Sequence, residues 1–142
     1  DGRRWRQDHG PIQREGFNAV ARLVNDLKTR QYDRFSSWLD HTVIVGFSEF
    51  SRTPLLNIRG GRDHHITNSC FLLGGNVRGG QVIGASSNVA MQAMPTRLSD
   101  GRPDPSGKIL RPEHILRSLY DEVGIGDEPD LRVSRLDTLL TT

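Results

Sequence analysis

Apolar positions along the chain follow a helical pattern first and extended patterns afterwards. Between Ile12 and Arg30 the apolar residues recur every three or four positions, as on one face of an amphipathic helix. Residues 42–47, TVIVGF, form a near-continuous β-branched run, which is typical of a strand covered on both faces. NSCFLLGG at 68–75 is a second such run. We therefore expect a helix over 13–30 and two neighbouring buried strands.

Turn signals are denser in the second half of the chain. NVRGGQVIGAS at 76–86 predicts a tight turn into a short third strand. The Gly and Pro content of residues 87–110 indicates an irregular segment without a core of its own. A second helix is predicted at 112–123, with Pro112 at its first position. Residues 128–142 are expected to form a C-terminal tail.

The order of these elements predicts an α/β fold with a mostly parallel sheet flanked by helices, over residues 1–127. With 142 residues, 35% of them hydrophobic and 25% charged, the chain fits one globular domain. A net charge of only +2 gives no basic stripe, so we expect no nucleic-acid partner. No apolar run approaches the length of a membrane span, so we expect no membrane partner. The polar start without Met reads like the middle of a longer protein.

Residues 48–65, SEFSRTPLLNIRGGRDHH, gather polar side chains directly after a predicted strand. Functional groups collect beyond the carboxyl ends of strands in open α/β sheets, and Glu49 should project there. A glycine pair lets the loop return Asp63 and His64 towards Glu49. Carboxylate and imidazole are the usual ligands of zinc or manganese, so the stretch predicts a divalent metal site. The competing interpretation is a solvated surface turn.

Arginines in the same stretch favour an anionic ligand. Arg52, Arg59 and Arg62 can bind an anion through bidentate hydrogen bonds. With a metal nearby, the stretch indicates a metal-assisted site for an anionic substrate.

Three other features have ordinary structural interpretations. Asp8 and His9 form another Asp-His pair, which also suits the N-cap region of the first helix. GGNVRGG at 74–80 lacks the Lys and Ser/Thr of a P-loop, and a glycine turn explains it. Cys70, the single cysteine, sits within an apolar strand and is expected to be an inert core residue.

Several motifs together resemble the C-terminal half of the bacterial "domain of unknown function 1501" proteins. These motifs are TVIVGFSEFSRTP, GGRDHH, LLGGNVRGGQVIGAS and RPEHILRSLYDEVGI, and the resemblance covers roughly residues 5–127. It implies the C-terminal part of an alkaline-phosphatase-like core, in the superfamily that includes the sulfatases. Members of the family commonly carry an export signal, so the resemblance implies a periplasmic or exported protein.

The resemblance also implies a set of metal ligands. His9 matches the His of a motif before the helix, where the family's Asp falls on Gln7 and Asp8 lies one place late. Glu49 matches the acidic residue at the strand end, and His64 matches the loop His, with Asp63 beside it. Departures from the family pattern are Phe50, where relatives often carry His, and His65, where Trp is usual.

Two functions stay open at this point. The first is the C-terminal part of a metal-dependent hydrolase of small phosphate or sulfate esters. In that enzyme Arg52 would neutralise the charge that develops on the transferred group. The superfamily's nucleophile and first carboxylate ligand have no counterpart here, so a missing N-terminal half or a homo-oligomer would have to complete the site. The second is a non-catalytic member of the same family that binds an anion or a carbohydrate.

Overall fold

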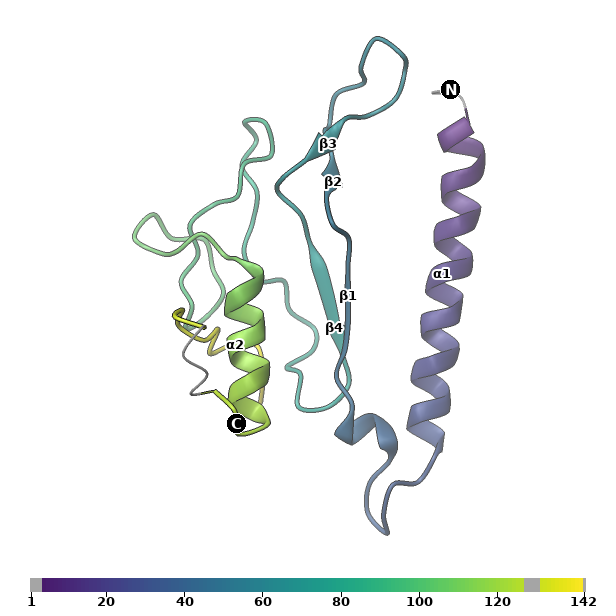
Figure 1. The fold of residues 1–142 in the computed structure, drawn as a ribbon, viewed down its shortest axis with the longest axis vertical. Helices are drawn as coiled ribbons and strands as arrows, with labels where there is room; N and C mark the ends of the chain where they lie inside the picture. The colour runs from purple at the N-terminus through teal and green to yellow at the C-terminus, as the bar shows by residue number, and fades with distance from the viewer. Residues whose placement is uncertain (1–3, 127–130, 142) are drawn as a thin grey trace. The chain divides into compact units, whose positions relative to one another are not determined.

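The structure is a computed structural model that describes residues 4–126 and 131–141, apart from the side chains of residues 4–7. The chain forms two compact units, one ending at Asn76 and the other beginning at Val77. Figure 1 labels the helices and strands of the described residues. The elements of the first unit are α1 (Arg4–Thr29), the 3₁₀ helix η1 (Trp38–His41), β1 (Ile44–Phe47), β2 (Ser51–Arg52), β3 (His64–His65) and β4 (Cys70–Leu73), and the second unit contains α2 (Pro112–Glu122). Among the described residues, no helix is long and apolar enough to cross a membrane.

The strands of the first unit pair antiparallel, and the predicted parallel α/β sheet is wrong. β1 pairs with β4 and β2 pairs with β3, each as a two-stranded antiparallel ladder (Figure 1). The predicted strands at 42–47 and 68–75 are neighbours, as expected, but they run in opposite directions. A parallel pair needs a long crossover, usually through a helix, and residues 48–67 form none. They turn back on themselves instead.

The two ladders form one ribbon, residues 44–73, with a one-residue offset between them. Three residues separate Phe47 from Ser51 on the outgoing arm, whereas four separate His65 from Cys70 on the returning arm. An extra residue on one arm is the hallmark of a β-bulge. Since a one-residue shift exchanges the two faces of a strand, the extra residue breaks the side-chain alternation of the returning arm between β3 and β4.

A glycine makes room for the aromatic ring that joins α1 to the ribbon. Gly46 lies opposite Phe71 in the ladder, and a Cβ at Gly46 would stand 2.2 Å from Cζ of Phe71. The Phe71 ring in turn lies 5.9 Å from the ring of Phe17 on α1, centroid to centroid. The Phe71 ring therefore packs over Gly46 and also contacts Phe17 of α1.

The first helix is longer and more exposed than its sequence pattern predicts. It begins at Arg4, so Pro11 and the Asp-His pair at 8–9 lie within it and not ahead of it. Val20, Val24 and Leu27 are half-buried, as expected for the inner face of an amphipathic helix. The apolar side chains nearer its start are open, among them Ile12 (65% exposed) and Phe17 (58% exposed).

The second unit has its core where a tail is expected. The most deeply buried apolar side chains are Leu136, Leu139 and Leu140. Ser118 of α2 holds this segment, because its hydroxyl donates to the carbonyl of His114 (2.9 Å) and accepts from the N–H of Leu136 (2.8 Å). α2 itself confirms the predicted helix at 112–123. The predicted third strand at 76–86 forms only isolated bridges, Val77 with Leu140 and Ser86 with Ala93.

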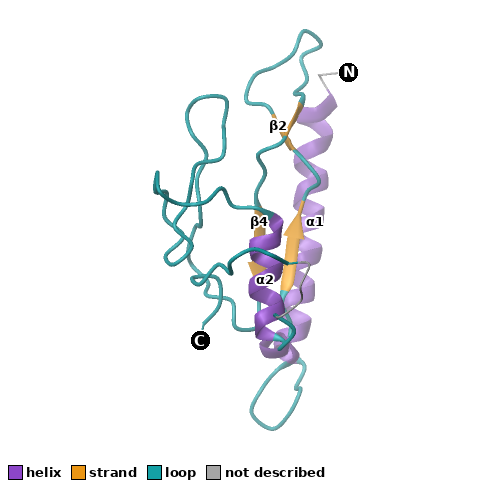
Figure 2. Ribbon diagram, turned by 60° about the vertical axis from the view of Figure 1, so that its left-hand side comes forward, coloured by secondary structure: helices purple, strands orange, loops and turns teal. Residues whose placement is uncertain are grey.

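The irregular segment at 87–110 is organised around a buried threonine. Thr96 is fully buried, and it exchanges two backbone hydrogen bonds with Lys108, at 2.7 and 2.9 Å. A Cβ at Gly107 would come within 2.4 Å of the Thr96 backbone, so glycine permits this approach. Figure 2 shows that the segment has neither helix nor strand of its own.

A carboxylate at the surface of this segment accepts hydrogen bonds from nearby side chains. Asp104 accepts from the hydroxyl of Ser106 (2.7 Å) and from the guanidinium of Arg97 (2.6 Å). The Ser106 hydroxyl and the Arg97 guanidinium favour the ionised form and lower the pKa of Asp104 to about 2.

We expect Gly46→Ala to lower the free energy of unfolding by about 1–3 kcal/mol, because the new methyl group displaces the Phe71 ring. Denaturant unfolding measures the change. Gly79→Ala is the control, since a Cβ at Gly79 meets nothing within 4 Å, and it should change stability by less than about 0.5 kcal/mol. Equal effects of the two substitutions would contradict the proposed packing.

Stability should also fall in acid through Asp104. Its pKa is depressed in the folded state, so its stabilising effect is present above the ordinary value of 3.8 and is lost as the pH falls towards about 2. Thermal unfolding between these pH values should show a smaller pH dependence for Asp104→Asn than for the wild type. An equal pH dependence in the variant and the wild type would contradict this role of Asp104.

Candidate functional site

The candidate site is the hairpin that ends the ribbon, residues 51–65. Its two arms are closed by reciprocal bonds between Thr53 and Asp63. The Thr53 N–H donates to the Asp63 carbonyl (2.9 Å), and the Asp63 N–H donates to the Thr53 hydroxyl (3.1 Å). These bonds extend the β2–β3 ladder by one step, so the residues beyond them form a closed tip (Figure 1).

One asparagine organises the tip. The Asn57 side-chain oxygen accepts from the N–H groups of Arg59 and Gly61, both at 3.0 Å. Its amide nitrogen donates to a carboxylate oxygen of Asp63 at 2.8 Å. Gly60 has a φ of 72°, in the left-handed region, which glycine adopts without strain. The tip is therefore held by its own polar groups and needs no apolar core.

An aromatic stack lies at the base of the hairpin. Arg52 is the ladder partner of His64, and side chains opposite each other share a face. The Phe50 ring stacks on the His64 ring, with centroids 3.6 Å apart and planes inclined by 17°. The Arg52 guanidinium lies 5.0 Å from the Phe50 ring centroid, a cation–π arrangement. Phe50, Arg52 and His64, here called the Arg-Phe-His stack, therefore form one surface.

Backbone contacts restrain the arginines of the hairpin. An Nη1 of Arg52 donates to the carbonyl of Arg62 (3.1 Å), and an Nη1 of Arg62 donates to the carbonyl of Thr53 (3.3 Å). A guanidinium has five N–H donors, so the bond to the Arg62 carbonyl uses only part of the donor capacity of Arg52. Arg52, Arg59 and Arg62 are all exposed. The hairpin thus presents partly oriented guanidinium groups to solvent.

The opposite face of the ladder is structural. The Ser51 hydroxyl donates to the Thr67 carbonyl, and the Thr67 N–H donates to Nδ1 of His65 at 3.0 Å. His65 is half-buried, whereas His64 is exposed. The two adjacent histidines therefore have separate surroundings.

The structure does not assemble the predicted metal ligands into one group. Asp8 and His9 are exposed positions of α1, and Glu49 is exposed between β1 and β2. Asp63 and His64 are neighbours in the hairpin, where Asn57 binds one oxygen of Asp63. In the part of the chain that the structure describes, no three His, Cys, Asp or Glu side chains lie close enough to share a metal ion. Arg52 beside His64 also opposes a divalent cation electrostatically.

Sequence reasoning missed Asn57 and gave Phe50 no role beyond replacing a histidine. Asparagine three residues before a glycine pair is a turn signal, because its side chain can bond to backbone N–H groups just ahead of it. The stack of Phe50 on His64 has no such local signal, since it depends on the pairing of distant strands. Cys70, expected to be a core residue, is exposed at the start of β4.

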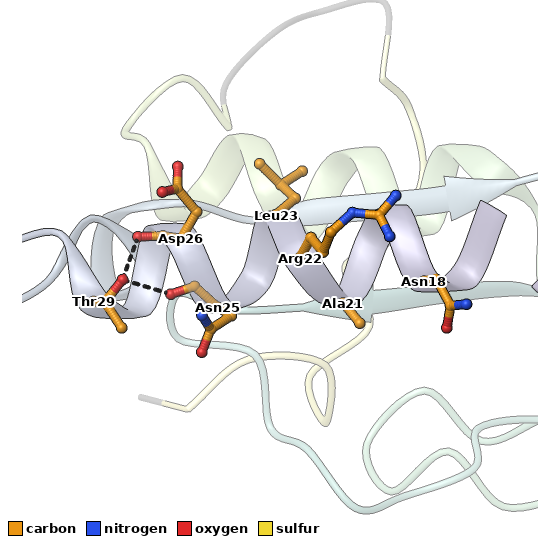
Figure 3. A pocket seen from close by; sticks show the side chains of 7 residues that line it. All are labelled: Asn18, Ala21, Arg22, Leu23, Asn25, Asp26 and Thr29. Carbon is orange, nitrogen blue, oxygen red and sulfur yellow. Dashed lines mark hydrogen bonds between the residues drawn. The ribbon is translucent and has the colours of Figure 1, made fainter. Parts of the chain in front are cut away.

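A shallow hollow elsewhere in this unit is an open helix face. Figure 3 shows its lining side chains, all of them from α1, with Thr29 donating to the carbonyls of Asn25 (2.9 Å) and Asp26 (3.2 Å). No second element contributes a lining residue. This face has no converging titratable groups, and the hairpin is the stronger candidate site.

The hairpin and its arginines define an antiparallel β-ribbon with a cationic end. Residues 6–100 match the family described as "Protein of unknown function (DUF1501)". The match covers more than half of the chain, which therefore belongs to this family. No curated protein and no solved structure matches the chain.

Asn57→Ala should open the tip of the hairpin, because it removes the side-chain bonds to Arg59, Gly61 and Asp63. Trypsin cleaves after arginine, so cleavage at Arg59 and Arg62 reports the opening. We expect about tenfold faster cleavage there, the equivalent of losing about one net hydrogen bond. Asn88→Ala, at an exposed position of the second unit, is the control and should cleave at the wild-type rate. An unchanged rate for Asn57→Ala would show that the tip does not depend on these bonds.

Proposed function

We propose that the hairpin binds an anionic group, a phosphate or a sulfate, and that this chain acts as a binding member of its family. The observation that carries the proposal is the position of Arg52 directly opposite His64, with Phe50 against both. A guanidinium held in this way presents a planar fork of donors, which matches the geometry of phosphate and sulfate oxygens.

The surrounding charges support an anion more than a cation. Arg59 and Arg62 lie in the same hairpin, whereas its only carboxylate, Asp63, is engaged by the Asn57 amide. Ordering the Arg52 side chain costs conformational entropy, and the Phe50 ring and the Arg62 carbonyl offset part of that cost before any ligand arrives. Such preorganisation favours binding.

The finer relationship to the alkaline-phosphatase and sulfatase superfamily belongs to the same proposal. It rests on the motifs of residues 42–127, and it would account for a site that prefers phosphate or sulfate esters. An exported location fits the same relationship. Under this proposal Arg52 binds the anionic group of the ligand.

A metal-dependent hydrolase of phosphate or sulfate esters is the second candidate. The donor types favour it, since Glu49, Asp63 and His64 all belong to the ribbon and suit zinc or manganese. Their positions do not fit a metal centre as they stand, because one Asp63 oxygen is bound by Asn57 and His64 is stacked on Phe50. No catalytic step through a metal follows from these positions.

Isothermal titration with sulfate and with phosphate at low ionic strength tests the proposal. Arg52→Gln should weaken binding about tenfold, as expected for the loss of one charge-assisted hydrogen bond. Arg14→Gln, at an exposed position of α1, removes the same charge outside the site and should leave the affinity unchanged. An equal loss in both variants would mean that net charge alone attracts the anion, and this would contradict the proposal.

The same protein distinguishes the second candidate. Tight binding of zinc or manganese that His64→Ala weakens more than tenfold, together with hydrolysis of an aryl phosphate or sulfate, would favour the hydrolase over the binding member. His65→Ala should weaken metal binding less, because His65 faces the other side of the ladder.

A further inference from the structure

The tip of the hairpin carries apolar side chains that nothing among the described residues covers. Leu55 is 77% exposed, Leu56 is 53% exposed and Ile58 is fully exposed. Single exposed apolar residues are ordinary, but three within four positions at the end of a hairpin are not. Figure 1 shows this tip extending beyond β2 and β3.

Positive charges lie behind this apolar tip. Arg52 and Arg62 are on the two arms, near the ladder, and Arg59 is within the tip. Along the hairpin, the order from the outside inward is therefore apolar side chains first and most of the guanidinium groups second. A lipid leaflet has the matching order, with hydrocarbon deepest and phosphate groups above it.

The conformation of the tip is restrained, and this keeps its apolar side chains exposed. Asn57 lies between Leu56 and Ile58, and its side-chain oxygen accepts from the N–H groups of Arg59 and Gly61, which fixes the turn that follows it. Pro54 further restricts the arm that leads into the tip. These side chains are therefore exposed in the closed hairpin itself. A surface that buries them does not have to reorganise the turn.

We propose that the anionic group bound by the hairpin is the phosphate of a membrane lipid, and that the tip inserts shallowly among the headgroups of an anionic lipid surface. This inference rests on the proposed function, because it identifies the source of the anion. Leu55, Leu56 and Ile58 enter the boundary between headgroups and acyl chains. Arg59 extends its guanidinium back to the phosphate level, as long cationic side chains do at such interfaces.

A soluble anion alone does not explain the whole hairpin. It would account for the arginines but would leave the apolar side chains in water. A lipid surface satisfies both, and the attraction of each arginine to an anionic leaflet adds to the burial of the tip. The absence of a spanning helix among the described residues has no bearing on a peripheral contact of this kind.

Co-sedimentation of the full chain with vesicles tests the inference. The vesicles are phosphatidylcholine alone and an equal mixture of phosphatidylcholine and phosphatidylglycerol. We expect binding to the mixed vesicles and weak binding to phosphatidylcholine, with the difference reduced by added salt. The double variant Leu55→Ser and Ile58→Ser should lose at least tenfold in vesicle affinity while it still binds free sulfate. Val82→Ser, at a 92% exposed apolar position outside the hairpin, should behave as the wild type.

Each other outcome counts against the inference in a distinguishable way. If the wild type binds sulfate but not mixed vesicles, the inference fails and the proposed function stands. If it binds neither, both fail. If vesicle binding is unaffected by the double variant, the tip is not the contact. If the chain sediments without vesicles and the double variant does not, the tip is covered by another protein molecule, and the inference is overturned.

Discussion

The antiparallel register of the ribbon is the constraint on which the candidate site depends. Because β2 and β3 run in opposite directions, Arg52 and His64 become direct neighbours although a whole loop separates them in the sequence. Phe50, two positions before Arg52, then lies on their face and contacts both. Ser51 and His65 are the next pair in the same ladder, so they lie on the opposite face, where they bind the backbone of Thr67. A cationic surface and a structural surface therefore arise from consecutive residues.

Part of the fold follows from local sequence patterns, and the rest depends on which segments meet. The helix at 112–123 has a proline start, an apolar stripe and a glycine stop, so nearby residues determine it. The extended segments at 42–47 and 68–75 are equally clear, and they pair as neighbours. Their apolar runs do not indicate whether the two strands pair parallel or antiparallel, however. The evidence for an antiparallel pair lies in the segment between them, which contains the turn residues of a hairpin. The burial of Leu136 and Leu140 depends on contacts with α2 and Val77. The sequence around these leucines is short and flanked by polar residues, so it does not indicate that they are buried.

Sequence patterns indicate which kinds of side chain a site contains more readily than how those side chains are arranged. The sequence draws attention to residues 48–65, because arginine, histidine and carboxylate side chains are concentrated there. Whether they converge on a metal depends on distances that the spacing alone does not determine. Asn57 takes part of the hydrogen-bonding capacity of Asp63, and Phe50 takes one face of His64. The convergence of Glu49, Asp63 and His64 with His9 stays a prediction, while their chemical types remain suited to zinc or manganese.

The bridge between Val77 and Leu140 has a consequence for how the second unit folds. It joins residues from the two ends of that unit, so it forms only after the intervening chain has been brought into a closed loop. Closing a long loop lowers the conformational entropy of the chain before burial of the leucine core offsets that cost. Non-local contacts of this kind slow folding. α2 and the turn around Thr96 rely on nearer neighbours and are able to form first. The pairing of the segment at Leu140 with Val77 should therefore be a late step in the folding of this unit. Because the leucine core needs this step, the unit should fold cooperatively.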